Sequence, residues 1–327
     1  MRIIIHLGYP RTSTTFLQKN IFPNHNQINF LGPNNYKKLA DAKITTDDLE
    51  LLALKNNQED LDNKIIYHSD KNLIKYFDEK KINLISTENY TMFQYRHFDF
   101  RDLQYLEILI KQHYKNAKFD FLIVLRNQYD LIKSLYFHNY HKISKLIKVK
   151  KFDQVFNLFL SKKSNQVDSN LKNFFLNYDF NELNIKLESK FNNSNIKYLF
   201  YEDFNLHREV FINEFCNFFE LDSDYTTNLF NKYISERTNA RKTILNKNYY
   251  IKTTNYKFIK SKTYFVLKKI IPFKSLFKKF FINNFVYSKF DLDFNKEEVL
   301  KQKFKEFYKN SNAKFFEQIK IKNKFKY

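Results

Sequence analysis

Four short apolar segments, separated by longer polar or helical stretches, constrain the fold of this chain more than any other feature. They are rich in Ile, Leu, Val and Phe, and they cover Arg2–Leu7, Ile82–Thr87, Phe119–Leu125 and Ile196–Tyr201. Such short, largely apolar runs are typical of strands that are buried on both faces of a sheet. The intervals between them leave room for helical crossovers, so the sequence predicts an α/β fold in three layers, with a mostly parallel sheet flanked by helices.

The intervals themselves carry helical patterns. The expected helices cover Thr14–Ile21, Leu103–Tyr114, Tyr129–Tyr140, Val155–Leu160, Phe211–Phe219 and Thr226–Ser235. A last amphipathic helix, Lys296–Ile319, is expected to pack on the core because its apolar residues recur at helical spacing: Val299, Leu300, Phe304, Phe307 and Phe315. The whole chain, 1–327, is predicted to be a single domain with a helical excursion at 33–78 and a basic, aromatic helical lobe at 250–290.

Composition and charge limit the class of protein. The net charge is +21, and the stretch from Arg237 to Phe290 holds 14 Lys or Arg with no Asp or Glu. A field of this sign attracts polyanions, nucleotides or acidic membrane surfaces. Cys216 is the single cysteine, which excludes an internal disulfide and gives no zinc pattern. No signal peptide and no membrane-spanning stretch is found, so a cytoplasmic location is expected.

The first strand runs into a hydroxyl-rich turn, Pro10-Arg11-Thr12-Ser13-Thr14-Thr15, and then into a helix. Against the phosphate-loop pattern G-x-x-x-x-G-K-[ST], Gly8 and Thr15 fit, while Ser13 and Thr14 replace the glycine and the lysine. Backbone N–H groups at the start of the helix, the hydroxyls and the guanidinium of Arg11 all suit an anion. The alternative is an ordinary strand–turn–helix in which the threonines cap the helix.

A second candidate site follows the third apolar run. Arg126 stands at the carboxyl end of that strand, and Ser134 lies eight residues later on the next helix. A guanidinium and a hydroxyl placed in this way converge on one phosphate. Taken alone, this stretch is better explained by a surface arginine and an ordinary helix serine.

Together these stretches resemble the sulfotransferases that use 3′-phosphoadenosine 5′-phosphosulfate (PAPS). Residues 6–18 look like the 5′-phosphosulfate loop of bacterial members, and Arg126 and Ser134 match the 3′-phosphate site in type and spacing. Leu199–Phe204 is similar to the strand that ends in Tyr-Glu-Asp-Leu, and Lys309–Phe316 looks like the closing helix. The resemblance implies a sulfotransferase fold related to that of the P-loop NTPases.

The resemblance also assigns roles to residues. It implies a PAPS site built from the loop and the 3′-phosphate pair, with 3′,5′-adenosine bisphosphate as product, and a basic loop over the nucleotide. The expected PAPS-binding residues are Pro10, Arg11, Thr12, Ser13, Thr14, Thr15, Arg126, Ser134, Arg237, Arg241 and Lys242. Arg11 takes the place of the family's lysine and can still neutralise the bridging oxygen, as a planar fork. Ser13 takes that of a loop glycine, where a side chain restricts positive φ, and both departures are interpreted as tolerated variation.

The resemblance implies a base at the end of a central strand, either a carboxylate or a histidine. Glu88 follows the second apolar run and is the preferred candidate for this role, with Arg11 as its catalytic partner at the leaving group. The alternative for Glu88 is a solvated acid at a strand end. His6, His138 and His141 are rival bases.

The resulting hypothesis is a PAPS-dependent sulfotransferase that transfers the sulfuryl group to a hydroxyl or an amine of an acceptor and needs no metal. The acceptor is expected to be a glycan or a lipid-linked glycan, with no nucleic acid as partner. The basic 250–290 segment either contacts an anionic membrane surface or covers the acceptor cleft. A P-loop kinase of small molecules and a non-enzymatic basic protein that binds membrane or nucleic acid are the alternatives.

Overall fold

The computed structural model describes residues 1–32, 74–91, 98–138, 152–161, 169–235, 248–252, 287–291 and 294–322. The chain forms two compact units. The first comprises residues 1–127, 177–238 and 311–326, and the second comprises 128–176, 239–310 and 327. The prediction of a single domain over 1–327 stays a prediction.

A five-stranded parallel sheet forms the centre of the first unit, with the strand order β2-β3-β1-β4-β5. Its strands are β1 (Arg2–Gly8), β2 (Ile28–Gly32), β3 (Ile82–Ser86), β4 (Lys118–Leu125) and β5 (Ile196–Phe200). The four predicted strands are confirmed, as is the α/β fold class. Because all neighbouring pairs are parallel, the carboxyl ends of the five strands lie along one edge of the sheet.

The edge strand β2 was not expected. It covers only Ile28-Asn29-Phe30-Leu31-Gly32, too short a run to stand out beside the four longer ones. Asn29 interrupts its apolar pattern, but its side chain is paired inside the sheet, where Nδ2 donates to Asn83 Oδ1 on β3 at 2.8 Å. The two buried amides thus satisfy each other across neighbouring strands, and β3, with an asparagine at the same position, was recognised because its predicted run is longer.

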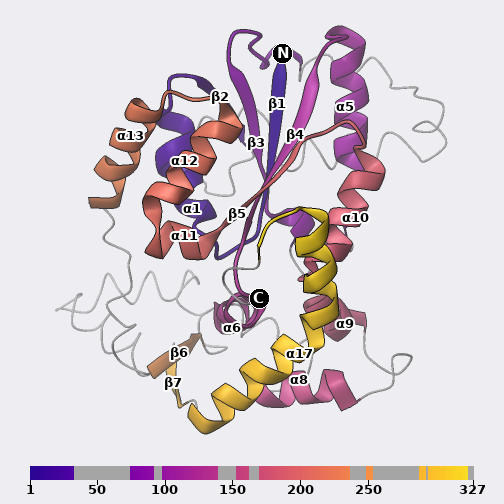
Figure 1. Ribbon diagram of the computed structural model, residues 1–327, viewed down its shortest axis with the longest axis vertical. Helices are drawn as coiled ribbons and strands as arrows, with labels where there is room; N and C mark the ends of the chain where they lie inside the picture. The colour runs from indigo at the N-terminus through magenta and orange to yellow at the C-terminus, as the bar shows by residue number, and fades with distance from the viewer. Residues whose placement is uncertain are drawn as a thin grey trace, which may run out of the picture. The chain divides into compact units, whose positions relative to one another are not determined.

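Helices cover both faces of this sheet, so the unit has three layers (Figure 1). On one face lie α1 (Thr14–Phe16), α12 (Arg208–Phe219) and α13 (Ser223–Ser235). On the other lie α5 (Arg101–His113) and α10 (Phe180–Lys190). Apolar residues of β1 are fully buried on both sides, which is what a central strand of such a sheet requires.

Phenylalanine fills much of the core between the sheet and α12. Phe211, Phe215 and Phe219 recur every four residues and so lie on one face of that helix, and all three are buried. The rings of Phe215 and Phe219 are 4.5 Å apart, and Phe22 packs on both. The high phenylalanine content of the chain therefore serves ordinary core packing here.

The second unit contains α6 (Gln128–His138), α8 (Phe152–Ser161), α9 (Ser169–Leu176) and an antiparallel pair, β6 (Asn248–Lys252) with β7 (Tyr287–Asp291). Its core is again aromatic: the rings of Phe156 and Phe304 stack 3.9 Å apart. Lys133 and Glu297 form a buried ion pair between α6 and the last helix.

The last helix, α17 (Phe294–Gln318), belongs to both units, with its change of unit between residues 310 and 311. Three of its predicted core residues are buried: Leu300, Phe304 and Phe315. The prediction for Val299 was wrong, because this side chain is 55% exposed. Val299 precedes Leu300 by one residue, and one residue is about 100° of helical turn, so the two cannot share one narrow face.

Most of the predicted 33–78 excursion and 250–290 lobe lies outside the described residues. At the two ends of the lobe the structure has the strands β6 and β7. None of the helices in the described part of the chain is long and apolar enough to cross a membrane.

A candidate anion site at the carboxyl ends of the strands

The turn after β1 begins at Gly8, whose φ is +96°. A Cβ atom at this position would lie 3.3 Å from both Glu88 Cγ and Thr91 Oγ1, and 3.2 Å from the Pro10 nitrogen. Glycine is therefore required twice, for its backbone conformation and for the close approach of the segment after β3. This contact brings the two strand ends together at the middle of the sheet edge.

Two residues of the turn adopt a left-handed backbone without being glycine: Arg11, with φ 72°, and Ser13, with φ 66°. The Ser13 carbonyl accepts hydrogen bonds from the N–H groups of Phe16 (2.9 Å) and Leu17 (3.1 Å), so the turn passes directly into the helix. Ser13 thus adopts a positive φ, the backbone conformation that favours glycine. Such a conformation costs a non-glycine residue about 1–2 kcal/mol.

The hydroxyls of the turn have different surroundings. Thr12 is fully buried, and its hydroxyl donates to the Tyr9 carbonyl. The only proton of this hydroxyl is therefore used inside the turn. The hydroxyl of Thr14 is bonded to Glu88. Ser13 Oγ is buried and has no hydrogen-bond partner among the described residues. A buried hydroxyl without a partner in a turn of this kind is available to a ligand.

Glu88 lies beneath this turn. Its carboxylate accepts the hydrogen bond from Thr14 and lies within the electrostatic reach of Arg11. Burial raises the pKa of Glu88 above its ordinary value, and the hydrogen bond from Thr14 and the charge of Arg11 lower it by less. A carboxylate with a raised pKa is a stronger base than one in water.

Arg126 stands at the carboxyl end of β4, next to the turn. One guanidinium nitrogen, Nη1, donates to the Arg11 carbonyl at 3.2 Å. The guanidinium carbon lies 4.7 Å from the centre of the Tyr201 ring, a cation–π contact with the residue that follows β5. The N–H of Asn127 donates to Glu202 Oε1 at 2.9 Å. Residues after β1, β4 and β5 are thereby joined at one edge.

The three histidines proposed as rival bases are placed differently. His6 is fully buried on β1: Nδ1 is 2.7 Å from Ser86 Oγ, and the ring edge packs on Phe22. Burial lowers the pKa of His6 to about 3. His138 ends α6 in the second unit, and His141 lies outside the described residues.

The structure does not test the expected PAPS-binding residues that lie outside the turn and Arg126. Ser134 lies on α6 in the second unit, so its pairing with Arg126 stays a prediction. Arg237, Arg241 and Lys242 lie outside the described residues. Pro10 and the exposed Thr15 belong to the turn itself.

Sequence reasoning missed two contributors, Tyr201 and Thr91. Tyr201 lies in the Leu199–Phe204 stretch that carries the resemblance, but the stretch gave no sign that the ring would stack on Arg126. Thr91 Oγ1 donates to the Leu7 carbonyl at 2.9 Å and fixes the segment after β3 to β1. No pattern in the sequence links residues 84 positions apart in this way.

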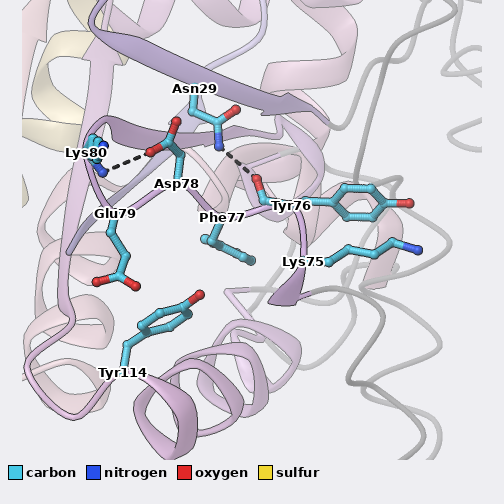
Figure 2. Close-up of a pocket in the computed structure, with 8 residues that line it drawn as sticks. All are labelled: Asn29, Lys75, Tyr76, Phe77, Asp78, Glu79, Lys80 and Tyr114. Carbon is cyan, nitrogen blue, oxygen red and sulfur yellow. Dashed lines mark hydrogen bonds between the residues drawn. The ribbon is translucent and has the colours of Figure 1, made fainter.

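An open pocket lies elsewhere in the first unit (Figure 2). Its volume is about 410 Å³, and its lining residues precede β3, belong to the start of β2 or follow α5: Asn29, Lys75, Tyr76, Phe77, Asp78, Glu79, Lys80 and Tyr114. These positions are at the amino ends of the parallel strands, the edge opposite the turn. Ligands of open parallel sheets bind at the carboxyl ends, so this pocket is not the candidate site.

Among the described residues, no group of three or more His, Cys, Asp or Glu side chains is arranged to hold a metal ion.

Comparison with known proteins supports the fold. No family model matches the sequence, and no curated protein matches it. The crystal structure of a sulfotransferase from Alicyclobacillus acidocaldarius is similar to this chain, with a TM-score of 0.50 and 10% sequence identity over 99% of this chain and 97% of that one. At this identity the likeness concerns the fold, which is that of a sulfotransferase.

Proposed function

We propose that this protein is a sulfotransferase that moves the sulfuryl group of PAPS to a hydroxyl group of an acceptor. Three observations support the proposal: the fold is shared with a sulfotransferase, a hydroxyl-rich turn with two positive-φ residues follows the central strand, and an arginine at the next strand end contacts that turn.

The residues of the turn suit a phosphosulfate group. Ser13 Oγ, buried without a partner among the described residues, would donate to one of its oxygens. The N–H groups at the start of α1 would do the same. Arg11 and Arg126 would supply positive charge on either side, and Arg126, in contact with the Tyr201 ring, would bind the 3′-phosphate through its planar fork.

When bound, PAPS supplies a sulfuryl group joined to a good leaving group, the 5′-phosphate. The acceptor oxygen forms a bond to sulfur while the bond from sulfur to the phosphate oxygen breaks. Glu88 takes the proton of the acceptor hydroxyl, and Arg11 stabilises the charge that develops on the departing 5′-phosphate. 3′,5′-Adenosine bisphosphate leaves as the second product, and the proton on Glu88 returns to solvent.

The single observation that carries the proposal is the position of Glu88. Its side chain lies against Gly8 and is bonded to Thr14, so a half-buried carboxylate stands beside the turn that would hold the donor. A structural acid at a strand end would gain nothing from burial, since desolvation of a carboxylate costs free energy. A base, in contrast, needs a raised pKa, and burial provides it.

For the acceptor we propose a glycan or a lipid-linked glycan, as the sequence suggested. Peripheral contact of the basic 250–290 segment with an anionic membrane is part of the same proposal. Transfer from sulfur-labelled PAPS to pools of glycans, glycolipids and simple alcohols tests the acceptor class, and labelling of the alcohol pool alone would contradict it.

The donor is tested by thermal shift. 3′,5′-Adenosine bisphosphate should raise the melting temperature without added metal, and each tenfold increase of free ligand above its Kd should add about 1.4 kcal/mol of stability. ATP with Mg²⁺ is the comparison. If only ATP with Mg²⁺ stabilised the protein, a P-loop kinase would replace the sulfotransferase as the proposed function.

A further inference from the structure

The segment that follows Glu88 is a single 3₁₀ turn, η4 (Asn89–Thr91), and it is fixed at two points. The first is Thr91, whose hydroxyl donates to the Leu7 carbonyl at 2.9 Å and whose N–H donates to the Glu88 carbonyl at 3.2 Å. Leu7 belongs to β1, the strand that leads into the turn. The contact therefore fixes the position of η4, and of Glu88 just before it, along that strand.

Tyr90 provides the second point. Its ring is 8% exposed and lies 5.6 Å from the ring of Phe100. Its hydroxyl donates to Asp102 Oδ2, and Asp102 stands in the first turn of α5. The other carboxylate oxygen, Oδ1, accepts from the Leu103 N–H at 3.0 Å, so the carboxylate is held from both sides. The turn next to Glu88 is thereby tied to α5, a helix of the layer that covers one face of the sheet (Figure 1).

This second contact is costly for the fold. Burial raises the pKa of Asp102 to about 6, which means that folding disfavours its charged form. The neighbouring Arg101 forms its ion pair with Asp99, at 2.8 Å. Among the described residues no cation forms an ion pair with Asp102. A neutral acceptor would bind the tyrosine hydroxyl at a lower desolvation cost, whereas a charged one gives a stronger bond.

We propose that Tyr90 and Asp102 are positioning residues for Glu88: the bond between them holds the η4 turn so that the Glu88 carboxylate stays beside the turn after β1. A charged acceptor makes a stronger and more directional hydrogen bond than a neutral one, which suits a contact whose task is to fix a geometry. The catalytic consequence rests on the proposed function, whereas the effect on Glu88 does not.

The first test therefore needs no activity. The titration midpoint of Glu88 is measured by NMR on protein labelled with ¹³C at the glutamate carboxyls, with the Glu88 signal identified by its loss in Glu88→Gln. In Tyr90→Phe the midpoint should move down, towards the ordinary glutamate value, by about 0.5 pH unit or more, because a loosened turn admits water. Asp102→Asn keeps an acceptor and should show a smaller shift.

The matched control is Tyr198→Phe, which removes another buried tyrosine hydroxyl, one that donates to Asn184 Oδ1 at 2.8 Å. It should leave the Glu88 midpoint unchanged. Equal midpoints in wild type and Tyr90→Phe would overturn the proposal, as would an equal shift in Tyr198→Phe, which would mean a general loosening of the fold.

The second test concerns turnover. Tyr90→Phe should lower kcat about tenfold or more with little change in the Kd of 3′,5′-adenosine bisphosphate, because a displaced base affects the chemical step. A loss of nucleotide affinity equal to the loss of kcat would overturn the positioning role. If the wild-type protein transferred no sulfuryl group, the proposed function would fail, and the NMR test would still decide the positioning of Glu88.

Discussion

The hydroxyl of Thr14 and the carboxylate of Glu88 are joined by a hydrogen bond, although the two residues lie 74 positions apart on different segments. Thr14 is the first residue of α1, and Glu88 follows β3. The residue that would help to hold an anion thus also holds the residue that would act as base. Anything that binds in the turn therefore changes the surroundings of Glu88.

One prediction concerns stability. The pKa of Glu88 is raised in the folded protein, so the folded state holds the proton more tightly than the unfolded state does. The charged side chain destabilises the fold once the pH rises above the ordinary glutamate value and through the raised one. Glu88→Gln should therefore raise the melting temperature at pH 7, by about 2–4 °C for each kcal/mol gained.

The same substitution should have no stabilising effect at acid pH, where Glu88 is protonated in both states. Calorimetric scans of both proteins from about pH 4, near the ordinary glutamate pKa, to about pH 8 measure the difference in melting temperature. Glu209→Gln is the matched control, because Glu209 is exposed in the first turn of α12. A gain in stability that did not depend on pH would contradict the explanation by charge.

A second prediction concerns proton uptake on binding. An anion in the turn adds negative charge beside Glu88 and competes for Thr14 and Arg11, the two groups that lower its pKa. Binding should raise the pKa of Glu88 further, so the complex should take up a proton, and the affinity should fall as the pH rises through that pKa. Titration calorimetry of 3′,5′-adenosine bisphosphate in buffers of different ionisation enthalpy measures the uptake.

The phosphates of the nucleotide also titrate and contribute to the proton uptake on binding. The uptake by wild type is therefore compared with the uptake by Glu88→Gln, which lacks the contribution of the Glu88 carboxylate. The difference should be at most one proton. Identical uptake by the two proteins would show that the anion binds away from Glu88.

Much of this architecture could be predicted from the sequence, because the strands that form the centre of the sheet are continuous apolar runs. The edge strand β2 was missed because its pairing with β3 is long-range: Asn29 Nδ2 donates both to Asn83 Oδ1 and to the Tyr76 carbonyl, on segments about 50 residues away. Val299 was misassigned for a different reason: helical spacing identifies the buried face only to within one residue. In the folded chain Leu300 is buried and Val299 is exposed.

For the candidate site, the rule that strand ends share an edge was sufficient to group the turn, Glu88 and Arg126. The contacts that give these residues their properties are long-range and involve ordinary residues. The stacking of Tyr201 on Arg126 and the bond from Tyr90 to Asp102 depend on the crossing of separate elements. Such contacts leave no periodic signal in a single sequence.

A third prediction concerns the recognition of the 3′-phosphate. Arg126→Ala should weaken 3′,5′-adenosine bisphosphate about 10-fold to 100-fold, the value of a charge-assisted hydrogen bond, and should weaken adenosine 5′-phosphate much less. Tyr201→Leu should give a smaller loss in the same direction because it removes the cation–π contact, and Tyr201→Phe, which keeps the ring, is its control. Equal losses for both nucleotides in Arg126→Ala would mean that Arg126 does not bind the 3′-phosphate.

The last prediction separates the backbone of Ser13 from its hydroxyl. The φ of 66° favours glycine there, so Ser13→Gly removes a cost of about 1–2 kcal/mol but adds about 0.5–1 kcal/mol of chain entropy in the unfolded state. Its stability should be within about 1 kcal/mol of wild type, while Ser13→Ala keeps the left-handed strain.

Both variants lose the buried hydroxyl. If that hydroxyl binds the donor, the two should lose the same affinity for 3′,5′-adenosine bisphosphate, about fivefold to tenfold for one neutral hydrogen bond, despite different stabilities. Melting temperatures and calorimetric affinities of the pair measure the two effects separately. An affinity loss in Ser13→Ala that Ser13→Gly did not share would assign the effect to the shape of the turn, and the hydroxyl would then have no part in binding.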